Sequence, residues 1–262
     1  WNVSSVANMS YLFEGASSFN QPLNNWDTSS ATQMISMFKN ANSLSNSNKG
    51  ETHKTFSSNS NWPYSSWSAY AVYTPITDSN FQTAVNLWFS NQADANATYG
   101  HISDWNVSAV TDMGNAFYNR SSFNENITGW DMSNVINMAS IFKGASAFNQ
   151  PIGDWNISSV TNMNSIFWGN GAFNKDIGSW DISSVTDTRH MFRLATSFNH
   201  DIGNWNTSNV TDMEYMFHIA TSFNQDLSDW NTSAVTKSVA MFSGTSALSD
   251  ANKGKIHKTF SS

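Results

Sequence analysis

A tryptophan returns at a fixed interval along most of this chain, and that interval constrains the fold more than any other feature. Trp stands at residues 105, 130, 155, 180, 205 and 230, and again at 1 and 26, so the period is 25 residues without an insertion inside either run. Self-similarity at a fixed period is typical of repeat architectures, in which each unit contacts only its neighbours. The sequence therefore predicts a stack of similar coils.

The pattern inside one repeat predicts two short elements. Numbered from its Trp, each repeat carries apolar residues at positions 1, 3, 6, 9, 12, 13, 16, 19 and 23. Positions 6 to 16 follow helical spacing, with Thr at position 7 as a candidate N-cap. Positions 23 to 28 read as a strand, with β-branched residues often following the Trp. We predict an α/β repeat solenoid, leucine-rich-repeat-like, with a short strand plus a short helix per 25-residue coil and a capping helix.

The aromatic residues and one asparagine recur in register. Eight of 12 Trp head repeats and 14 of 18 Phe occupy positions 13 and 19, which predicts stacked aromatic ladders inside the coils. Asn at position 20 follows the core Phe wherever the stack continues. We expect its amide to point inward and to bond the backbone of the next coil. The residues are Asn20, Asn124, Asn149, Asn174, Asn199 and Asn224.

A second, longer period divides the chain into beads. Residues 1–58 match residues 205–262 at an offset of 204 in about half of all positions. We expect a processed or excerpted piece of a longer chain in which such beads recur, because the sequence starts in mid-repeat. The predicted parts are 1–58, the last two repeats and C-terminal cap of one solenoid bead; 59–76, an aromatic-rich linker; 77–104, an N-terminal cap with a helix at about 79–90; 105–248, a six-repeat solenoid; and 249–262, a C-terminal cap.

The linker at residues 59–76 carries an aromatic stripe. Rings at every third position suit an extended or PPII-like segment that lies against a neighbour. We interpret them as the junction between beads, with a sugar-stacking strip as the alternative. The junction candidates are Trp62, Tyr64, Trp67, Tyr70 and Tyr73.

Composition limits the classes of partner. The formal net charge is −7 and no basic cluster occurs, which argues against nucleic acid as a partner. No run of about 18 apolar residues is present, so we expect no transmembrane segment. The absence of cysteine excludes a disulfide framework and leaves the compartment open.

The repeat motif resembles a known family. The pattern W-[ND]-x-S-x-V-T-[DN]-M-x-x-[MIL]-F-x-x-A-x-x-F-N resembles the BspA-like leucine-rich-repeat surface proteins, and residues 84–113 are similar to the segment that commonly precedes such arrays. The resemblance implies a solenoid on a cell surface or in secreted material, with adhesion as its usual proposed role. It implies no catalytic residues.

The sequence offers little catalytic or metal chemistry. It contains no Gly-rich phosphate loop, no His-x-x-x-His and no G-x-S-x-G, and its six His are scattered. We therefore expect no enzyme and no cofactor. Stacked carboxylates near the corners are an alternative site for Ca²⁺ between coils. These are Asp104, Asp112, Asp154, Asp212 and Asp229.

Glycosylation sequons are the distinctive surface signal. Five of them share repeat position 2, where stacking would align them as a glycan stripe; the alternative is that position 2 is a plain polar strand site. Three others, Asn96, Asn119 and Asn126, fall on predicted loops. The full set is Asn2, Asn8, Asn96, Asn106, Asn119, Asn126, Asn156, Asn206, Asn209 and Asn231.

Together these features predict a structural protein, extracellular or on the cell surface, that is glycosylated and self-associates head to tail into filaments. The alternative is an adhesin or a carbohydrate- or protein-binding solenoid module, with glycans or cell-surface ligands as partners. Exposed aromatics that vary between repeats are its candidate contacts: Tyr118, Trp168 and Tyr215. An enzyme is the third interpretation.

Overall fold

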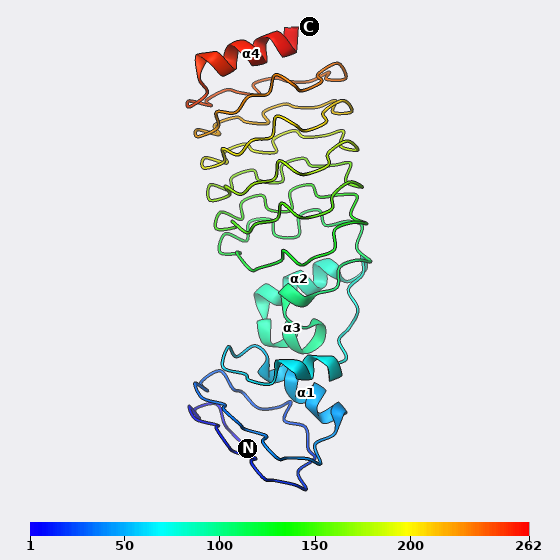
Figure 1. Cartoon of the computed structure of the whole chain (residues 1–262), viewed down its shortest axis with the longest axis vertical. Coiled ribbons are helices and arrows are strands. Elements are labelled where there is room, and N and C mark those ends of the chain that lie inside the picture. Colours follow the sequence, from blue (N-terminus) through cyan, green and yellow to red (C-terminus); the bar gives the residue numbers. More distant parts are fainter. Residues whose placement is uncertain (262) are drawn as a thin grey trace. The chain divides into compact units, whose positions relative to one another are not determined.

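The computed structural model describes residues 1–261 and divides into two compact units. Unit 1 comprises Trp1–Pro75 and Asn86–Trp105, and unit 2 comprises Ile76–Val85 with the residues from Asn106 onward. Helix α2 lies within the range of about 79–90 where the sequence predicts a helix. The elements, of which Figure 1 labels the α-helices, are α1 (Asn46–Phe56), η1 (Ser65–Tyr70, a 3-10 helix), α2 (Phe81–Ser90), α3 (Gln92–Tyr99), η2 (Ile102–Asp104, a 3-10 helix) and α4 (Asp250–Ser261).

The repeats contain neither the strand nor the helix that the sequence predicts. Between residues 105 and 249 the chain forms turns and single-residue parallel bridges, and no longer strand occurs anywhere in residues 1–261. The bridges join position 8 of successive repeats, as at Asn137 and Asn162, and not positions 23 to 28. The prediction of an α/β solenoid with a strand plus a helix per coil is therefore wrong. In Figure 1 the repeats of unit 2 are irregular coils, stacked one on the next.

Two left-handed residues in each repeat explain why the helical spacing misleads. Positions 11 and 15 have positive φ in every repeat, for example 62° at Ser165 and 73° at Gly169. Such residues interrupt a right-handed helix. They direct alternate N–H groups, including those of Met163, Ser165 and Phe167, to carbonyls of the next coil at 2.9 Å. Because three-residue turns also bring positions 9, 12, 13 and 16 to one side, their apolar pattern resembles that of a helix.

Phenylalanine ladders form the core, as the sequence predicts. Phe167 stacks on Phe173 of its own repeat with a centroid separation of 3.9 Å, and on Phe142 and Phe192 of the adjacent repeats at 5.9 and 5.7 Å. Each buried aromatic side chain removes about 150–250 Å² from water. By area this contributes at most about 4–6 kcal/mol per ring.

In the later coils of unit 2 the Trp at repeat position 1 is buried, and its indole N–H donates to a carbonyl of the coil before it; these residues are Trp155, Trp180, Trp205 and Trp230. Nε1 of Trp180 donates to the carbonyl of Ile152 at 3.0 Å, and Nε1 of Trp205 donates to that of Ile177 at 3.1 Å. The two indoles stack with a centroid separation of 6.5 Å. Each of these carbonyls also accepts a backbone N–H, as that of Ile152 does from Trp155 at 3.2 Å, so a Phe at this position would remove one of two donors.

Two polar ladders join the coils at the surface. Oδ1 of Asn149 accepts the N–H of Asn174 at 3.0 Å, and Oδ1 of Asn174 accepts that of Asn199 at 3.1 Å. The predicted amide bonds to the next coil are thus confirmed, although these amides are at least partly exposed rather than inward. At position 7, the hydroxyl of Thr186 donates to the carbonyl of Thr161 at 3.3 Å. Threonine here links coils and does not cap a helix.

Helices lie against the first and last coils of unit 2. Phe81 of α2 packs edge to face on Trp130 with a centroid separation of 6.0 Å. At the other end, the hydroxyl of Thr259 in α4 donates to the carbonyl of Ser228 at 3.2 Å, and α4 lies over the last coil (Figure 1). Within residues 1–261, every helix is too short or too polar to cross a membrane.

Candidate functional site

A strip of aromatic and cationic side chains runs over five successive coils of unit 2. The strip occupies repeat positions 11 and 14, where the residue type varies from one repeat to the next. Position 11 is one of the left-handed positions, and position 14 follows the core Phe. We call this set the aromatic–cationic strip. It consists of Tyr118, Lys143, Trp168, His190, Arg193, Tyr215 and His218.

Trp168 lies at the centre of the aromatic–cationic strip. Nζ of Lys143 lies 3.8 Å from its ring centroid, and Cζ of Arg193 lies 4.6 Å from it. The two cations come from the coils on either side. Lys143 also lies 5.4 Å from the ring of Tyr118, and Arg193 lies 5.5 Å from that of Tyr215. Contacts of this kind contribute about 0.5–1 kcal/mol each at exposed sites, so the rings hold the cations in a fixed order.

His190 completes the strip between two rings. Its ring stacks on Trp168 with a centroid separation of 4.9 Å and on Tyr215 at 5.1 Å. Burial, followed by the positive charges of Arg193 and Arg189, lowers the pKa of His190 to about 4. The imidazole is therefore neutral at pH 7, and the positive charge of the strip comes from its Lys and Arg.

Several nitrogen atoms of this region have unused hydrogen-bonding capacity. Four are buried and have no hydrogen-bond partner among the described residues: Nε of Arg189, Nδ1 of His190, Nε of Arg193 and Nδ1 of His218. Buried polar atoms are normally paired, and an unpaired one costs about 1–3 kcal/mol. Neither Lys143 nor Arg193 forms an ion pair within residues 1–261. The four nitrogen atoms are shielded from solvent, so it is the side chains of Lys143 and Arg193, without an acidic partner, that fit the binding of an anion.

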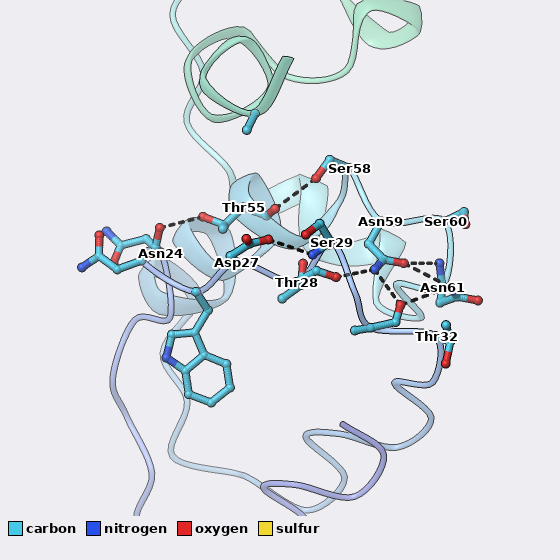
Figure 2. A pocket seen from close by; sticks show the side chains of 14 residues that line it. Asn24, Asp27, Thr28, Ser29, Thr32, Thr55, Ser58, Asn59, Ser60 and Asn61 are labelled. Carbon is cyan, nitrogen blue, oxygen red and sulfur yellow. Dashed lines mark hydrogen bonds between the residues drawn. The ribbon is translucent and has the colours of Figure 1, made fainter. Parts of the chain in front are cut away.

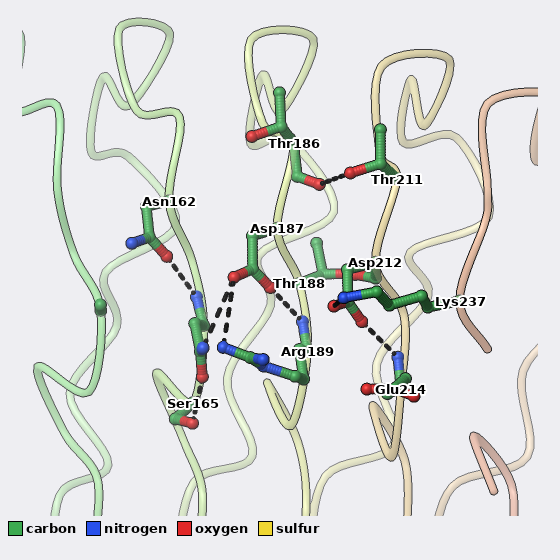
Figure 3. Close-up of polar contacts among 12 residues, drawn as sticks. Asn162, Ser165, Thr186, Asp187, Thr188, Arg189, Thr211, Asp212, Glu214 and Lys237 are labelled. Atoms are coloured by element: carbon green, nitrogen blue, oxygen red, sulfur yellow. Dashed lines mark hydrogen bonds and ion pairs between the residues drawn. The ribbon is translucent and has the colours of Figure 1, made fainter. Parts of the chain in front are cut away.

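Acidic side chains flank the strip at positions 8 and 10. Oδ2 of Asp187 lies 3.8 Å from the guanidinium of Arg189, and Oδ2 of Asp212 lies 3.5 Å from Nζ of Lys237 (Figure 3). The other oxygen of Asp212 accepts the N–H of Glu214 at 3.0 Å. These pairs neutralise Arg189 and Lys237.

Sequence reasoning found part of this strip. It named Tyr118, Trp168 and Tyr215, and the structure brings these rings together through the residues between them. It missed Lys143 and Arg193, because each looks like an isolated surface charge in the sequence. The 25-residue period could have predicted these contacts, because residues 25 apart lie side by side in a stack, and Lys143, Trp168 and Arg193 are spaced by 25.

The sequons at position 2 share one geometry. Oδ1 of Asn106 accepts the N–H of Ser108 at 3.1 Å and its hydroxyl at 2.7 Å. In the repeat with Asp131, the hydroxyl and then the N–H of Ser133 lower the pKa of the carboxyl through the same turn. The turn thus requires a side-chain acceptor oxygen at position 2, which Asn and Asp both supply, and does not require the Nδ2 of Asn. The Asn residues at this position are exposed: Asn2, Asn106, Asn156, Asn206 and Asn231.

The other sequons differ in their exposure. Asn96 is only 1% exposed and lies inside α3, so its assignment to a loop is wrong. The side chain of Asn209 is exposed, but its Nδ2 donates to the carbonyl of Ser183 at 2.7 Å. The three remaining candidates are exposed: Asn8, Asn119 and Asn126.

The aromatic linker is not an extended stripe. Residues 65–70 form η1, whose three residues per turn produce the same spacing as a PPII segment. Trp62, Tyr64 and Trp67 pack on the core of unit 1. Tyr70 is 39% exposed, and Tyr73 lies 5.9 Å from Nζ of Lys54.

A polar groove of about 620 Å³ lies in unit 1 beside the second repeat (Figure 2). Its amide groups bond within the unit: Nδ2 of Asn59 donates to the carbonyls of Thr28 and Ala31 at 2.7 and 2.8 Å. The hydroxyl of Thr55 donates to the carbonyl of Asn24 at 3.2 Å. The groove therefore follows a structural seam between the second repeat and the residues after α1.

The corner carboxylates do not gather into a metal centre. Asp112 accepts from the amide of Asn137 in the next coil at 2.8 Å, and Asp212 pairs with Lys237. Among the described residues, no group of three or more His, Cys, Asp or Glu is arranged to hold a metal ion.

One cluster combines the residue types of a hydrolase triad. Oγ of Ser103 lies 2.8 Å from Nδ1 of His101 and 3.2 Å from Oδ1 of Asp104. In a catalytic triad the acid contacts the second nitrogen of the imidazole. Here Asp104 contacts the serine, and Nδ1 of His101 also accepts the N–H of Ser103 at 3.3 Å as the cap of η2. The geometry is that of a helix cap.

Comparison with known proteins assigns the repeat. No curated protein and no solved structure matches the chain. Three segments in tandem, residues 1–73, 83–192 and 169–259, match one family, and together they include nearly all of both arrays. The chain is thus a tandem-repeat protein, and it belongs to the family described as "Mycoplasma protein of unknown function, DUF285".

Proposed function

We propose that this chain is part of a BspA-like extracellular or cell-surface repeat protein that binds an acidic polysaccharide along unit 2. The observation that carries the proposal is the pair of cations, Lys143 and Arg193, held by Trp168 and free of ion pairs among the described residues. These cations are two coils apart, which is about 10 Å if neighbouring coils are about 4.8 Å apart. A polymer with regularly spaced carboxylates or sulfates fits such a row.

The contacts of Trp168 favour an acidic over a neutral ligand. A neutral sugar binds mainly by laying its C–H face on an open ring. Lys143 and Arg193 already approach this ring from the coils on either side, and His190 stacks against it. A neutral sugar would have to displace these groups, whereas an anion adds to them.

Titration calorimetry with heparin tests the proposal on the whole chain. We expect binding that weakens as salt rises, because exposed charges are screened. Replacing both cations, Lys143→Ala with Arg193→Ala, should weaken binding at least tenfold. The matched control is Lys175→Ala, a cation of unit 2 outside the strip, which should leave affinity within about twofold.

Three outcomes of this titration would contradict the proposal of an acidic polysaccharide. Equal affinity for a neutral polysaccharide, or affinity that is unchanged in the double variant, would overturn the proposal. Tighter binding of polyglutamate than of heparin would transfer the site to an acidic peptide.

A second candidate function is structural: beads joined head to tail into a glycosylated filament. It is supported by the repeated end of the array, because Asn20 and Asn224 each accept an N–H from the serine that precedes a helix, at 2.9 Å in both cases. Electron microscopy of the native material should then show an axial repeat of one bead per 204 residues. Dispersed, isolated particles would count against it.

Under either candidate function the chain is a binding or structural protein, it catalyses no reaction and it uses no cofactor. Hydrolysis by the purified chain that is lost on replacing one acidic residue would contradict it.

A further inference from the structure

The two array ends have the same residues but different coverings. At the offset of 204, Phe38 corresponds to Phe242, and Phe56 of α1 corresponds to Phe260 of α4. The helices also begin alike, since the hydroxyl of Ser45 accepts the N–H of Asn48 at 3.2 Å, as that of Ser249 accepts the N–H of Asn252 at 3.3 Å. The structure around each pair of Phe rings can therefore be compared directly.

In unit 1 three rings fill the space between the last coil and α1. Trp67 lies 5.1 Å from Phe38, and Tyr64 lies 5.6 Å from it. Trp62 lies 5.0 Å from Phe56 in an edge-to-face contact. Phe38 and Phe56 are consequently only 5% and 0% exposed.

The covering segment also satisfies a backbone donor. The N–H of Phe38 donates to the phenol oxygen of Tyr64 at 2.8 Å. Inside an array this N–H, at position 13, donates to a carbonyl of the next coil, as Phe217 does to Met241 at 2.9 Å. Tyr64 therefore replaces the missing next coil.

In unit 2 the same space is a cavity. It has a volume of about 480 Å³ and is lined mainly by Met241, Phe242, Leu248, Ile256 and Phe260. Phe242 and Phe260 are half-buried, in contrast to Phe38 and Phe56. Among residues 1–261, the N–H of Phe242 has no hydrogen-bond partner.

We infer that this cavity is a docking site for an aromatic peptide segment with the chemistry of residues 59–70, NSNWPYSSWSAY. Its tyrosine hydroxyl accepts the N–H of Phe242, and its two tryptophans cover Phe242 and Phe260. The inference does not depend on the acidic-polysaccharide proposal, because the cavity lies under α4 and contains no residue of the aromatic–cationic strip.

The test uses a synthetic peptide of this sequence, titrated into the full chain and followed by calorimetry and by NMR. We expect one site per chain, with the largest shifts at the amide of Phe242 and the methyl of Met241. A peptide with its first tyrosine changed to phenylalanine should bind about tenfold more weakly, because the acceptor is lost. A peptide with both tryptophans changed to alanine should not bind.

A substitution that fills the cavity tests the same site from the side of the protein. Ser238 is exposed and lines the cavity, so Ser238→Phe should occupy it, preserve folding and weaken peptide binding at least tenfold. Ser246→Ala, outside the cavity, should leave affinity unchanged. The inference is overturned if the peptide fails to bind at millimolar concentration, or if Ser238→Phe binds as tightly as the unmodified chain. It is also overturned if sedimentation shows that the chain is dimeric and the peptide does not displace the second copy.

Discussion

The carboxylate of Asp78 takes the place of a preceding coil for Thr111. Its Oδ1 accepts the N–H of Thr111 at 2.7 Å, and its Oδ2 accepts the hydroxyl at 2.7 Å. In a later coil the same two groups of Thr186 donate to the carbonyl of Thr161. Asp78 therefore caps the stack of coils at its first repeat.

Replacing this carboxylate should destabilise unit 2 in a pH-dependent way. The bonds from Thr111, first from its hydroxyl, lower the pKa of Asp78. Its stabilisation is therefore present above the unfolded value of about 3.9 and is lost as pH falls through the lower folded-state pKa. We expect Asp78→Asn to lower the free energy of unfolding by about 1 kcal/mol at pH 7, as for loss of an exposed cap. Urea unfolding at pH 7 and pH 2 measures this.

The control for this prediction is Asp154→Asn, an exposed carboxylate just before a Trp. The free energy of unfolding of this variant should equal that of the unmodified chain at both pH 7 and pH 2. A loss at pH 2 as large as that at pH 7 for Asp78→Asn would contradict an electrostatic cap.

The indole N–H of Trp180 should be needed in addition to its ring. Trp180→Phe keeps most of the apolar volume but removes one of the two donors to the carbonyl of Ile152, the indole N–H at 3.0 Å, and leaves the backbone N–H of Trp155 at 3.2 Å. We expect a loss of about 1 kcal/mol in the free energy of unfolding. Trp1→Phe, at a ring that is 90% exposed, should change stability by less than about 0.5 kcal/mol. Equal losses in the two variants would refute this role.

The asparagine ladder should act locally. Asn174→Ala removes the acceptor of the Asn199 N–H, so we expect hydrogen exchange at that amide to accelerate about fivefold to tenfold, equivalent to about 1 kcal/mol. Asn174→Asp retains an acceptor oxygen and should preserve protection. If both variants exchange alike, the ladder bond does not protect the amide.

His190 should make stability fall as the solution is acidified. Burial and the charges of Arg193 and Arg189 lower its pKa to about 4, from a usual value of about 6.5. Between these values the unfolded state binds more protons, so stability is full above pH 6.5 and declines toward pH 4. His190→Phe keeps the ring stack and should flatten this part of the pH profile, as measured by thermal unfolding. An unaltered slope would exclude His190 as its source.

Burial of Asn96 makes a prediction about glycosylation. When the chain is expressed in a glycosylating secretory pathway, mass spectrometry of the folded protein should find glycans at position 2, as at Asn106, and none at Asn96. Asn96 is 1% exposed inside α3, so a glycan there would prevent packing. Recovery of folded protein glycosylated at Asn96 would contradict the fold of α3.

The sequence predicted the features that depend on repetition. Stacked Phe ladders and the Asn174 to Asn199 bond follow from the period, because identical residues 25 apart meet in a stack. The aromatic candidates of the strip, such as Trp168, were recognisable because they break the repeated pattern. Lys143 and Arg193 were not recognisable as members of the strip, because their contacts with Trp168 depend on which positions of adjacent coils face each other.

The sequence by itself determined that the chain repeats every 25 residues, which residues form its core and which amides join its coils. Only the tertiary structure decided the backbone path within a coil. The N–H of Ser165 bonds to a carbonyl of the next coil and its φ is positive, so local spacing alone cannot distinguish this path from a helix. For the same reason the covering of Phe38 by Tyr64, and the uncovered Phe242, could be seen only once distant segments were placed together.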